Sequence, residues 1–436
     1  MVNISDELKA ALLADGSHKE LTVFIPDLDK TYTNNNIVLE SMKLEQSVMA
    51  SDSLEFVGCI ASSFEIKINN ISDNAKGKKI VVSMMVDDIQ ETILLFTGIV
   101  DSVKSETDST ISTVVAYDML YSASQNDWTD KYNNHSETSV EQLLYEILFD
   151  CGITPSPDLV VKNGSVAAFC GTKRKGKSLA ALDLIKQVCQ LAGGFGSINA
   201  AGRFNIIYIT DDPTVNLRYP ATNIYPSGNI YPDYLAGGND PRAVVPFYEY
   251  CRYEGYKVNK INKVEIRDSE KEEEPASYGS GKNKYIIQGN IFCYDQTKET
   301  KVQIAHRIYS AVANITYTPF EAKNNGMPWL ECGDELVYYD INDKSKKRNF
   351  FVFSRSLTGI QFLQDLFSAD GEQNQKIFIT DLQAQIDDIK DDTYSKEETD
   401  EIIDELREDM LDAYAVPNEP PSDWKRRTIY FIYEEE

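Results

Sequence analysis

The residues whose spacing most directly suggests chemistry are Gly171, Gly176, Lys177 and Ser178, which together match the pattern G-x-x-x-x-G-K-[ST]. In nucleoside-triphosphate enzymes this loop wraps backbone N–H groups around the phosphates, while the lysine and the hydroxyl serve the terminal phosphates and Mg²⁺. The match lies between an apolar run, SVAAFC, and a predicted helix, SLAALDLIKQVCQLAGG. A strand before the loop and a helix after it are the context that this chemistry requires.

The segments that follow this helix argue against nucleotide binding. FGSIN and RFNIIYI flank Ala200-Ala201-Gly202, a pattern that predicts a β-hairpin. A hairpin makes neighbouring strands antiparallel, whereas phosphate-binding α/β folds need parallel strands joined by crossovers. We therefore interpret residues 171–178 as a basic loop whose Ser178 caps the helix, and we expect no nucleotide cofactor. An assembly factor that binds a nucleoside triphosphate through residues 171–178 remains an alternative.

No other set of residues suggests catalysis. The histidines His18, His135 and His306 are isolated, and neither an H-E-x-x-H nor a G-x-S-x-G pattern surrounds them. The cysteines are odd in number and never form a C-x-x-C pair, which predicts reduced and mostly buried thiols rather than a metal site. They are Cys59, Cys151, Cys170, Cys189, Cys251, Cys293 and Cys332. We predict that the protein is not an enzyme and holds no metal.

Composition limits the partners of the chain. Its 436 residues contain 43 Lys and Arg against 69 Asp and Glu, and the formal net charge of −26 repels nucleic-acid backbones. Hydrophobic residues make up 42% of the chain, which is enough for several packed domains. The N-terminus lacks a signal-peptide pattern, and no apolar run is long enough to span a membrane. We expect a protein made in the cytoplasm without a signal peptide.

The hydrophobic pattern predicts a mainly β protein with an α+β insert. After a helical segment at residues 1–20, a period of two dominates residues 21–120 and predicts a first antiparallel β-domain, a small barrel or sandwich. Residues 121–250 are expected to form the insert, in which Thr138-Ser139 can cap a helix over VEQLLYEILFDCG that Gly152 stops. Strand patterns return in residues 251–370, broken by one predicted helix, KVQIAHRIYSAVANI, and they predict a second β-domain.

The closing strands of the two predicted β-domains are similar to each other. FTGIVDSVK and TVVAYDML in the first domain correspond to FVFSRSLTGIQFLQDLFS in the second, and each strand pair ends in Asp followed closely by Leu. We interpret this similarity as a divergent duplication.

Residues 213–250 are rich in proline and tyrosine and contain the tetrapeptide Asn-Ile-Tyr-Pro twice. The repeats end in Tyr225-Pro226 and Tyr231-Pro232. We expect no regular structure in this segment, because loops of this length are either functional or draped over a surface. Its tyrosines are candidates for gripping a partner, and an irregular connection between domains is the alternative.

Residues 371–415 are predicted to form an acidic helix. Residues 381–412 contain 14 acidic and three basic residues, and apolar side chains recur at steps of three and four. So narrow a stripe is expected to pair with copies of itself in a trimeric coiled coil, with a single amphipathic helix on the protein body as the alternative. The stripe consists of Ile379, Leu382, Ile386, Ile389, Ile403, Leu406 and Met410. A Pro-rich joint and a strand, TIYFIY, are predicted for residues 416–436.

This order of segments resembles the hub proteins of phage and prophage tail tips over about residues 21–370. The resemblance lies in SLEFVGCIASSFEIKI, FTGIVDSV, VVAYDMLY, LIKQVCQLAGGFGSINAAGRFNIIYI, the Tyr-Pro repeats, GMPWLECGDELVYY and LTGIQFLQDLFSADG. The matching positions that we take as structural motif residues are Phe96, Gly98, Tyr117, Asp118, Pro328, Gly333 and Asp334. The terminal NEPPSDWKRRTIYFIY is similar to short modules at the ends of tail-tip and fibre proteins.

The resemblance implies a structural role in a virion. Two tube-type β-barrel domains per chain would let a homotrimer sit on a six-fold tail-tube or distal-tail ring and close the tube. Expected partners are that ring, the tape-measure protein and a fibre or receptor-binding protein, while DNA would pass an acidic lumen without specific binding. Some related proteins carry a wall-degrading domain, so a tail-associated cell-wall-degrading enzyme is the other alternative.

Overall fold

The computed structural model describes most of the chain. It describes residues 1–436 except positions 1, 3, 15, 50–57, 88, 106, 108, 169–178, 210–242, 246–247, 269–271, 273, 295, 340–346, 374–376, 380–411, 418–427 and 434–436. The chain divides into two units, Met1–Thr380 and Asp381–Glu436. Within the described part, no helix is both long enough and apolar enough to cross a membrane.

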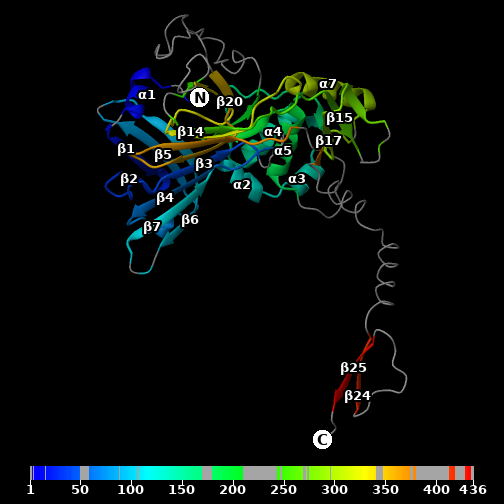
Figure 1. The fold of residues 1–436 in the computed structure, drawn as a ribbon, viewed down its shortest axis with the longest axis horizontal. Coiled ribbons are helices and arrows are strands. Elements are labelled where there is room, and N and C mark those ends of the chain that lie inside the picture. Colours follow the sequence, from blue (N-terminus) through cyan, green and yellow to red (C-terminus); the bar gives the residue numbers. More distant parts are fainter. Residues whose placement is uncertain are drawn as a thin grey trace, which may run out of the picture. The chain divides into compact units, whose positions relative to one another are not determined.

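An 11-stranded antiparallel sheet dominates the first unit (Figure 1). Seven neighbouring strands come from the predicted first β-domain: β3 (Lys43–Ser47), β4 (Ser63–Asn69), β7 (Ile111–Tyr117), β6 (Ile93–Ser105), β5 (Lys79–Val86), β1 (Lys19–Ile25) and β2 (Lys30–Tyr32). The other four come from the predicted second β-domain: β14 (Tyr248–Tyr253), β18 (Phe320–Asn325), β22 (Gln364–Ala369) and β21 (Ser354–Thr358). Alternating buried and partly exposed residues along these strands give the period of two seen in the sequence.

The two strand sets meet at β3 and β21, which are more than 300 residues apart in the chain. Their antiparallel register runs from Ser47 opposite Ser354 to Lys43 opposite Thr358. The hydroxyl oxygens of Ser47 and Ser354 lie 2.7 Å apart, so side chains also connect the strands. The described pairings therefore join both sets in one sheet, and the closure of each set into its own barrel stays a prediction.

The predicted α+β insert follows β7 directly. Its elements are α2 (Met119–Gln125), α3 (Thr129–Asn134), β8 (Thr138–Ser139), α4 (Val140–Asp150), β9 (Thr154–Pro155), β10 (Ala167–Ala168), α5 (Ala181–Ala192), β11 (Phe195–Ile198) and β12 (Arg203–Ile207). As predicted, Ser139 caps α4: its hydroxyl accepts a hydrogen bond from the backbone N–H of Gln142. Gly152 follows α4 in the left-handed region with φ +69°, which suits a residue without a Cβ. The predicted hairpin is the antiparallel pair β11 and β12.

The predicted second β-domain, residues 251–370, contributes strands to the large sheet and to two smaller sheets, each of which also takes one strand from outside that range. Besides the four strands in the large sheet, β13 (Ala243–Val244), β19 (Glu335–Tyr339) and β20 (Lys347–Phe351) form a three-stranded sheet. A third sheet contains β16 (Ala276–Gly279), β15 (Lys263–Arg267), β17 (Lys284–Gln288) and β23 (Ile377–Ile379), and the predicted helix, α7 (Lys298–Val312), packs on β15 and β16. Two pairings in this sheet are parallel, so its four strands form a sheet separate from the large antiparallel one.

Two expectations about irregular and helical segments need correction. Residues 213–250 are not wholly irregular, because β13 and the beginning of β14 lie within them. Ile379, the first residue of the predicted heptad stripe, lies in β23 beside β17, because backbone pairing with an existing sheet satisfies its hydrogen bonds there. The predicted helix also cannot reach residue 415, since β24 (Asp412–Pro417) pairs in parallel with β25 (Thr428–Tyr433), the predicted terminal strand. The other stripe residues, at 382–410, lie outside the described residues.

The N-terminal segment predicted as helical at residues 1–20 contains one short helix and the beginning of β1. Residues 6–13 form α1 (Asp6–Leu13), which Ser5 caps, and short 3-10 turns lie at Pro26–Leu28 and Asp73–Ala75. The six cysteines that the structure describes are free thiols, five of them buried and Cys251 partly buried. Burial raises the pKa of Cys293 and Cys332 to about 12, so these thiols stay protonated and unreactive at neutral pH.

Candidate functional site

The nucleotide-binding motif at residues 171–178 lies outside the described residues, but its surroundings are described. β10, which leads into the motif, pairs antiparallel with β8, and β11, which follows the helix, belongs to another sheet. The helix begins at Ala181 with Ala180 as its N-cap, so the prediction that Ser178 caps this helix is wrong. Instead, the Asp183 carboxylate accepts a hydrogen bond from the N–H of Ala180. A phosphate-binding loop would need parallel strands in one sheet and a helix that begins at the motif.

Asp118, one of the motif residues of the first β-domain, lies buried at the start of α2. Asp118 is 1% exposed, and its carboxylate accepts hydrogen bonds from the N–H of Ser62 at 2.7 Å and of Leu120 at 2.9 Å. The first bond ties the approach to β4 to the end of β7, and the second caps α2. Burial, the largest influence, raises the pKa of Asp118 to about 7, although both backbone hydrogen bonds act to lower it. The role of Asp118 is to hold three elements together.

Gly98 allows β6 and β7 to approach closely. A methyl carbon at this position would lie 2.3 Å from the carbonyl oxygen of Tyr117 and 2.6 Å from the ring of Phe96. The ring of Phe96 stacks on that of Phe64 at 5.4 Å between centroids, inside the core. Gly98 therefore packs closely against Phe96 and the backbone of Tyr117.

The motif residues of the second β-domain shape the turn before β19. Gly333 has φ +94°, and its N–H donates to the carbonyl of Val352 at 2.7 Å. The carboxylate of Asp334 accepts from the N–H of Glu331 at 2.8 Å, which closes the turn that follows Pro328.

A buried ion pair holds the other side of this turn. Arg355 on β21 contacts Asp365 on β22 through two hydrogen bonds, at 2.8 and 3.0 Å, and it also donates to the carbonyls of Met327 and Leu330. Asp365 is fully buried and accepts from the N–H of Met327 at 2.6 Å. The Asp-Leu similarity that suggested a duplication does not mark equivalent places, because Asp118 follows β7 whereas Asp365 lies within β22.

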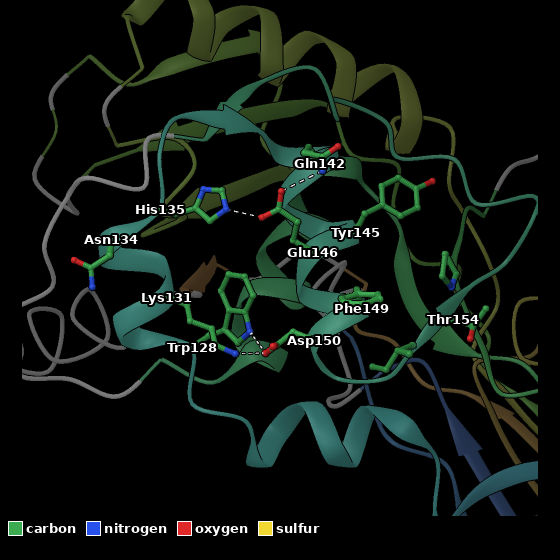
Figure 2. Close-up of a pocket in the computed structure, with 12 residues that line it drawn as sticks. Trp128, Lys131, Asn134, His135, Gln142, Tyr145, Glu146, Phe149, Asp150 and Thr154 are labelled. Carbon is green, nitrogen blue, oxygen red and sulfur yellow. Dashed lines mark hydrogen bonds and ion pairs between the residues drawn. The ribbon is translucent and has the colours of Figure 1, made fainter.

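The insert carries an open surface groove of 840 Å³ (Figure 2). Residues from α3, α4 and the loop through β9 line it: Trp128, Lys131, Asn134, His135, Gln142, Tyr145, Glu146, Phe149, Asp150, Ile153, Thr154 and Pro155. The core of α4 faces inward through Leu143, Leu144, Ile147 and Leu148, all fully buried, so Tyr145, Glu146 and Phe149 turn toward the groove.

One wall of the groove is organised by Asp150. Its Oδ2 accepts hydrogen bonds from Lys131 at 2.5 Å, from the Trp128 indole at 2.9 Å and from Asn126 at 3.0 Å. The hydrogen bond from Lys131 is the largest influence that lowers the pKa of Asp150. Figure 2 shows the lysine and the indole converging on this carboxylate, which fixes the C-terminal end of α4 against α3.

A second ion pair lies further along α4. The His135 ring contacts the Glu146 carboxylate at 2.5 Å through Nε2 and the carbonyl of Ser136 at 2.7 Å through Nδ1, while Gln142 donates to the other oxygen of Glu146 at 3.1 Å. The hydrogen bond to Ser136 is the largest cause of the raised pKa of His135. Because both ring nitrogens face acceptors, the imidazolium form is favoured.

The charged residues that line this groove form two pairs. Lys131 pairs with Asp150 and His135 with Glu146, and the lining residues include no serine or cysteine. Among the described residues, no cluster of three His, Cys, Asp or Glu side chains could hold a metal ion. We did not predict the groove from the sequence. The available signal was Phe149, an aromatic residue outside the apolar stripe of its helix.

The other predicted sites are not brought together in the described chain. Tyr225, Pro226, Tyr231 and Pro232, the proposed partner loop, lie outside the described residues, as do all heptad residues except Ile379.

Solved structures similar to this chain are described as tail proteins. The tail protein from Neisseria meningitidis MC58 is 10% identical with a TM-score of 0.47, and the match covers 80% of this chain and 95% of that one. The tail protein of prophage MuSo2 from Shewanella oneidensis is 11% identical with a TM-score of 0.47, and the match covers 80% and 97%. A prophage tail protein from Listeria monocytogenes EGD-e is 11% identical with a TM-score of 0.44, covering 81% and 95%. No family model and no curated protein matches the chain.

Proposed function

We propose that this chain is a structural hub subunit of the tail tip of a phage, a prophage or a tail-like particle, and that it is not an enzyme. In this role it is part of the virion and forms a homotrimer that closes the tail tube. Each trimer connects the six-fold tube or distal-tail ring, with the tape-measure protein inside it, to fibre or receptor-binding proteins. DNA passes through its lumen without specific binding, because the net charge of −26 per chain disfavours contact with phosphates.

The observation that carries this proposal is the continuous sheet. Strands from residues 19–117 and from residues 248–369 lie in one antiparallel sheet through β3 and β21, so a single chain presents two adjacent antiparallel strand sets. Three copies supply six such sets, which is the number that a six-fold ring offers. The motif clusters around Asp118 and Arg355 use their polar groups to fasten strands and turns, as a structural subunit requires.

Trimer formation is tested with the full chain in solution. Light scattering at micromolar concentration is expected to give a mass three times the 49.2 kDa of one chain. Replacing Leu382 and Leu406 with Asp is expected to yield monomers, because charges in an apolar heptad seam oppose association. Leu39→Asp is the matched control, since that leucine is exposed in the structure and lies outside the seam. A stable monomer of the unmodified chain would contradict the trimer.

The hub role itself is tested with the ring protein of the same particle. Electron microscopy is expected to show one trimer on one face of a six-fold tube or distal-tail ring. Absence of any complex at micromolar concentrations of both proteins would contradict the hub role. Clearing of peptidoglycan in a zymogram by the purified chain would instead support the enzyme alternative.

A further inference from the structure

Two cysteine sulfurs from distant parts of the chain lie in contact inside the first unit. The Sγ atoms of Cys59 and Cys189 are 3.9 Å apart, although 130 positions separate the two residues in the sequence. Cys59 is 2% exposed and Cys189 is fully buried. Both are free thiols, and the structural role proposed above uses neither of them.

A glycine provides the space in which the two sulfurs meet. Gly196, on β11, forms an isolated parallel β-bridge with Cys59, and its N–H donates to the carbonyl of Gly58 at 3.2 Å. A methyl carbon at Gly196 would lie 2.0 Å from the Cys59 sulfur and 2.9 Å from the Cys189 sulfur. Backbone pairing therefore places Cys59, and the missing side chain of Gly196 lets its sulfur lie against Cys189 on α5.

We propose that Cys59 and Cys189 are a modification site, at which a peroxide oxidises the two thiols to an intramolecular disulfide. The bond would tie the segment before β4 to α5 of the insert. A disulfide has a sulfur–sulfur distance of about 2.05 Å, so the two sulfurs must move about 1.9 Å closer when it forms. The site uses no residue of the heptad stripe, so it does not depend on whether the chain forms a trimer.

The chemistry consumes one hydrogen peroxide in two steps. The hydrogen bond with Cys59, followed by burial, raises the pKa of Cys189, so Cys189 keeps its proton at neutral pH and we take Cys59 as the attacking sulfur. Cys59 displaces one peroxide oxygen, which leaves a sulfenic acid on Cys59 and releases one water. The Cys189 sulfur then attacks the Cys59 sulfur, the S–OH bond breaks and a second water leaves. Both sulfurs are oxidised, and both peroxide oxygens are reduced to water.

A small oxidant can reach Cys59 by a local opening of the backbone. Cys59 lies in an isolated β-bridge rather than within a strand, and the two residues that follow it, Ile60 and Ala61, are partly exposed. Segments of this kind open more easily than the core of a sheet. In the proposed hub role the particle leaves the reducing cytoplasm, and the disulfide would form only after that.

The test treats the full, folded chain with hydrogen peroxide at about pH 8, where a larger fraction of thiols is ionised than at pH 7. Remaining thiols are blocked with iodoacetamide, and the chain is digested with trypsin without a reductant. Trypsin cuts after Lys and Arg, so Cys59 lies in peptide 44–67 and Cys189 in peptide 187–203, with no other cysteine in either. Mass spectrometry is expected to show these two peptides linked, with the loss of two hydrogen atoms, and dithiothreitol should separate them.

Three variants and an unfolded sample make the result specific. Cys59→Ser and Cys189→Ser should each abolish the linked peptides, whereas Cys251→Ser, at a partly buried thiol elsewhere, should leave them unchanged. Unfolding the chain in urea before oxidation should distribute the disulfides over other cysteine pairs, because only the folded chain holds these two sulfurs together. Absence of the linked peptides from the oxidised native chain, or the same mixture of disulfides from native and unfolded chain, would overturn the proposal.

Thermal unfolding measures what the bond does to the fold. A crosslink over 130 positions restricts the unfolded chain, so the oxidised protein is expected to melt at least about 2 °C higher than the same sample after dithiothreitol. This difference should vanish in Cys59→Ser. Equal melting temperatures of the crosslinked and reduced chains would contradict a stabilising tie between the segment before β4 and α5.

Discussion

Asp118 is expected to make the stability of this protein depend on pH in an unusual direction. A helix-capping carboxylate that accepts two backbone hydrogen bonds ordinarily has a lowered pKa and stabilises the fold above its pKa. Here burial dominates and raises the pKa of Asp118 to about 7 in the folded chain, from an ordinary 3.8. Between these two values the folded protein holds a proton that the unfolded chain has lost. Its free energy of unfolding therefore falls as pH rises through this range and levels off above pH 7.

The size of the effect follows from these two pKa values. The contribution of Asp118 to the free energy of unfolding should decrease by about 3 kcal/mol between pH 5 and pH 8, and by about 4 kcal/mol over the whole range. Many other carboxylates titrate in the same range, so the quantity to measure is the difference between the unmodified chain and Asp118→Asn. Asparagine cannot titrate, but it keeps one oxygen that can accept the N–H of Leu120.

Urea unfolding at several pH values measures this difference. Asp118→Asn is expected to cost most at pH 5, where Asp118 is protonated, and progressively less toward pH 8. Asp158→Asn, at an exposed position, controls for the general effect of removing one carboxylate. A cost that is the same at every pH, or that grows as pH rises, would refute the reasoning, because it would mean that the hydrogen bonds outweigh burial.

Two further predictions concern the packing of the large sheet. Arg355→Met should lower the free energy of unfolding, measured in urea, by about 3–5 kcal/mol, because it leaves the buried Asp365 carboxylate without its cation. The double change Arg355→Met with Asp365→Leu should cost clearly less than the sum of the two single changes. Gly98→Ala should cost about 1–3 kcal/mol in the same assay, since the added methyl would overlap the carbonyl of Tyr117, while Gly255→Ala, where the space is open, should be close to neutral.

The sequence determined the local elements of this protein because their signals are local. The Ser139 cap and the Gly152 stop of α4, the hairpin of β11 and β12, and α7 all follow from residues within a few positions of each other. The period of two likewise predicted the strands of the large sheet, since it reports only that one face of each strand is buried. The same locality explains the error at Ile379, whose spacing fits a helix but whose backbone pairs with β17.

Only the tertiary structure decided how these elements combine. The sequence does not predict that β3 pairs with β21, because a strand pattern does not identify the partner strand and more than 300 residues separate the two. The separation of β15 and β17 from the large sheet, and the burial that raises the pKa of Asp118, also depend on which surfaces meet. The groove at Phe149 is the clearest case: its walls come from α3, α4 and β9, and only their packing leaves that ring exposed beside a hollow.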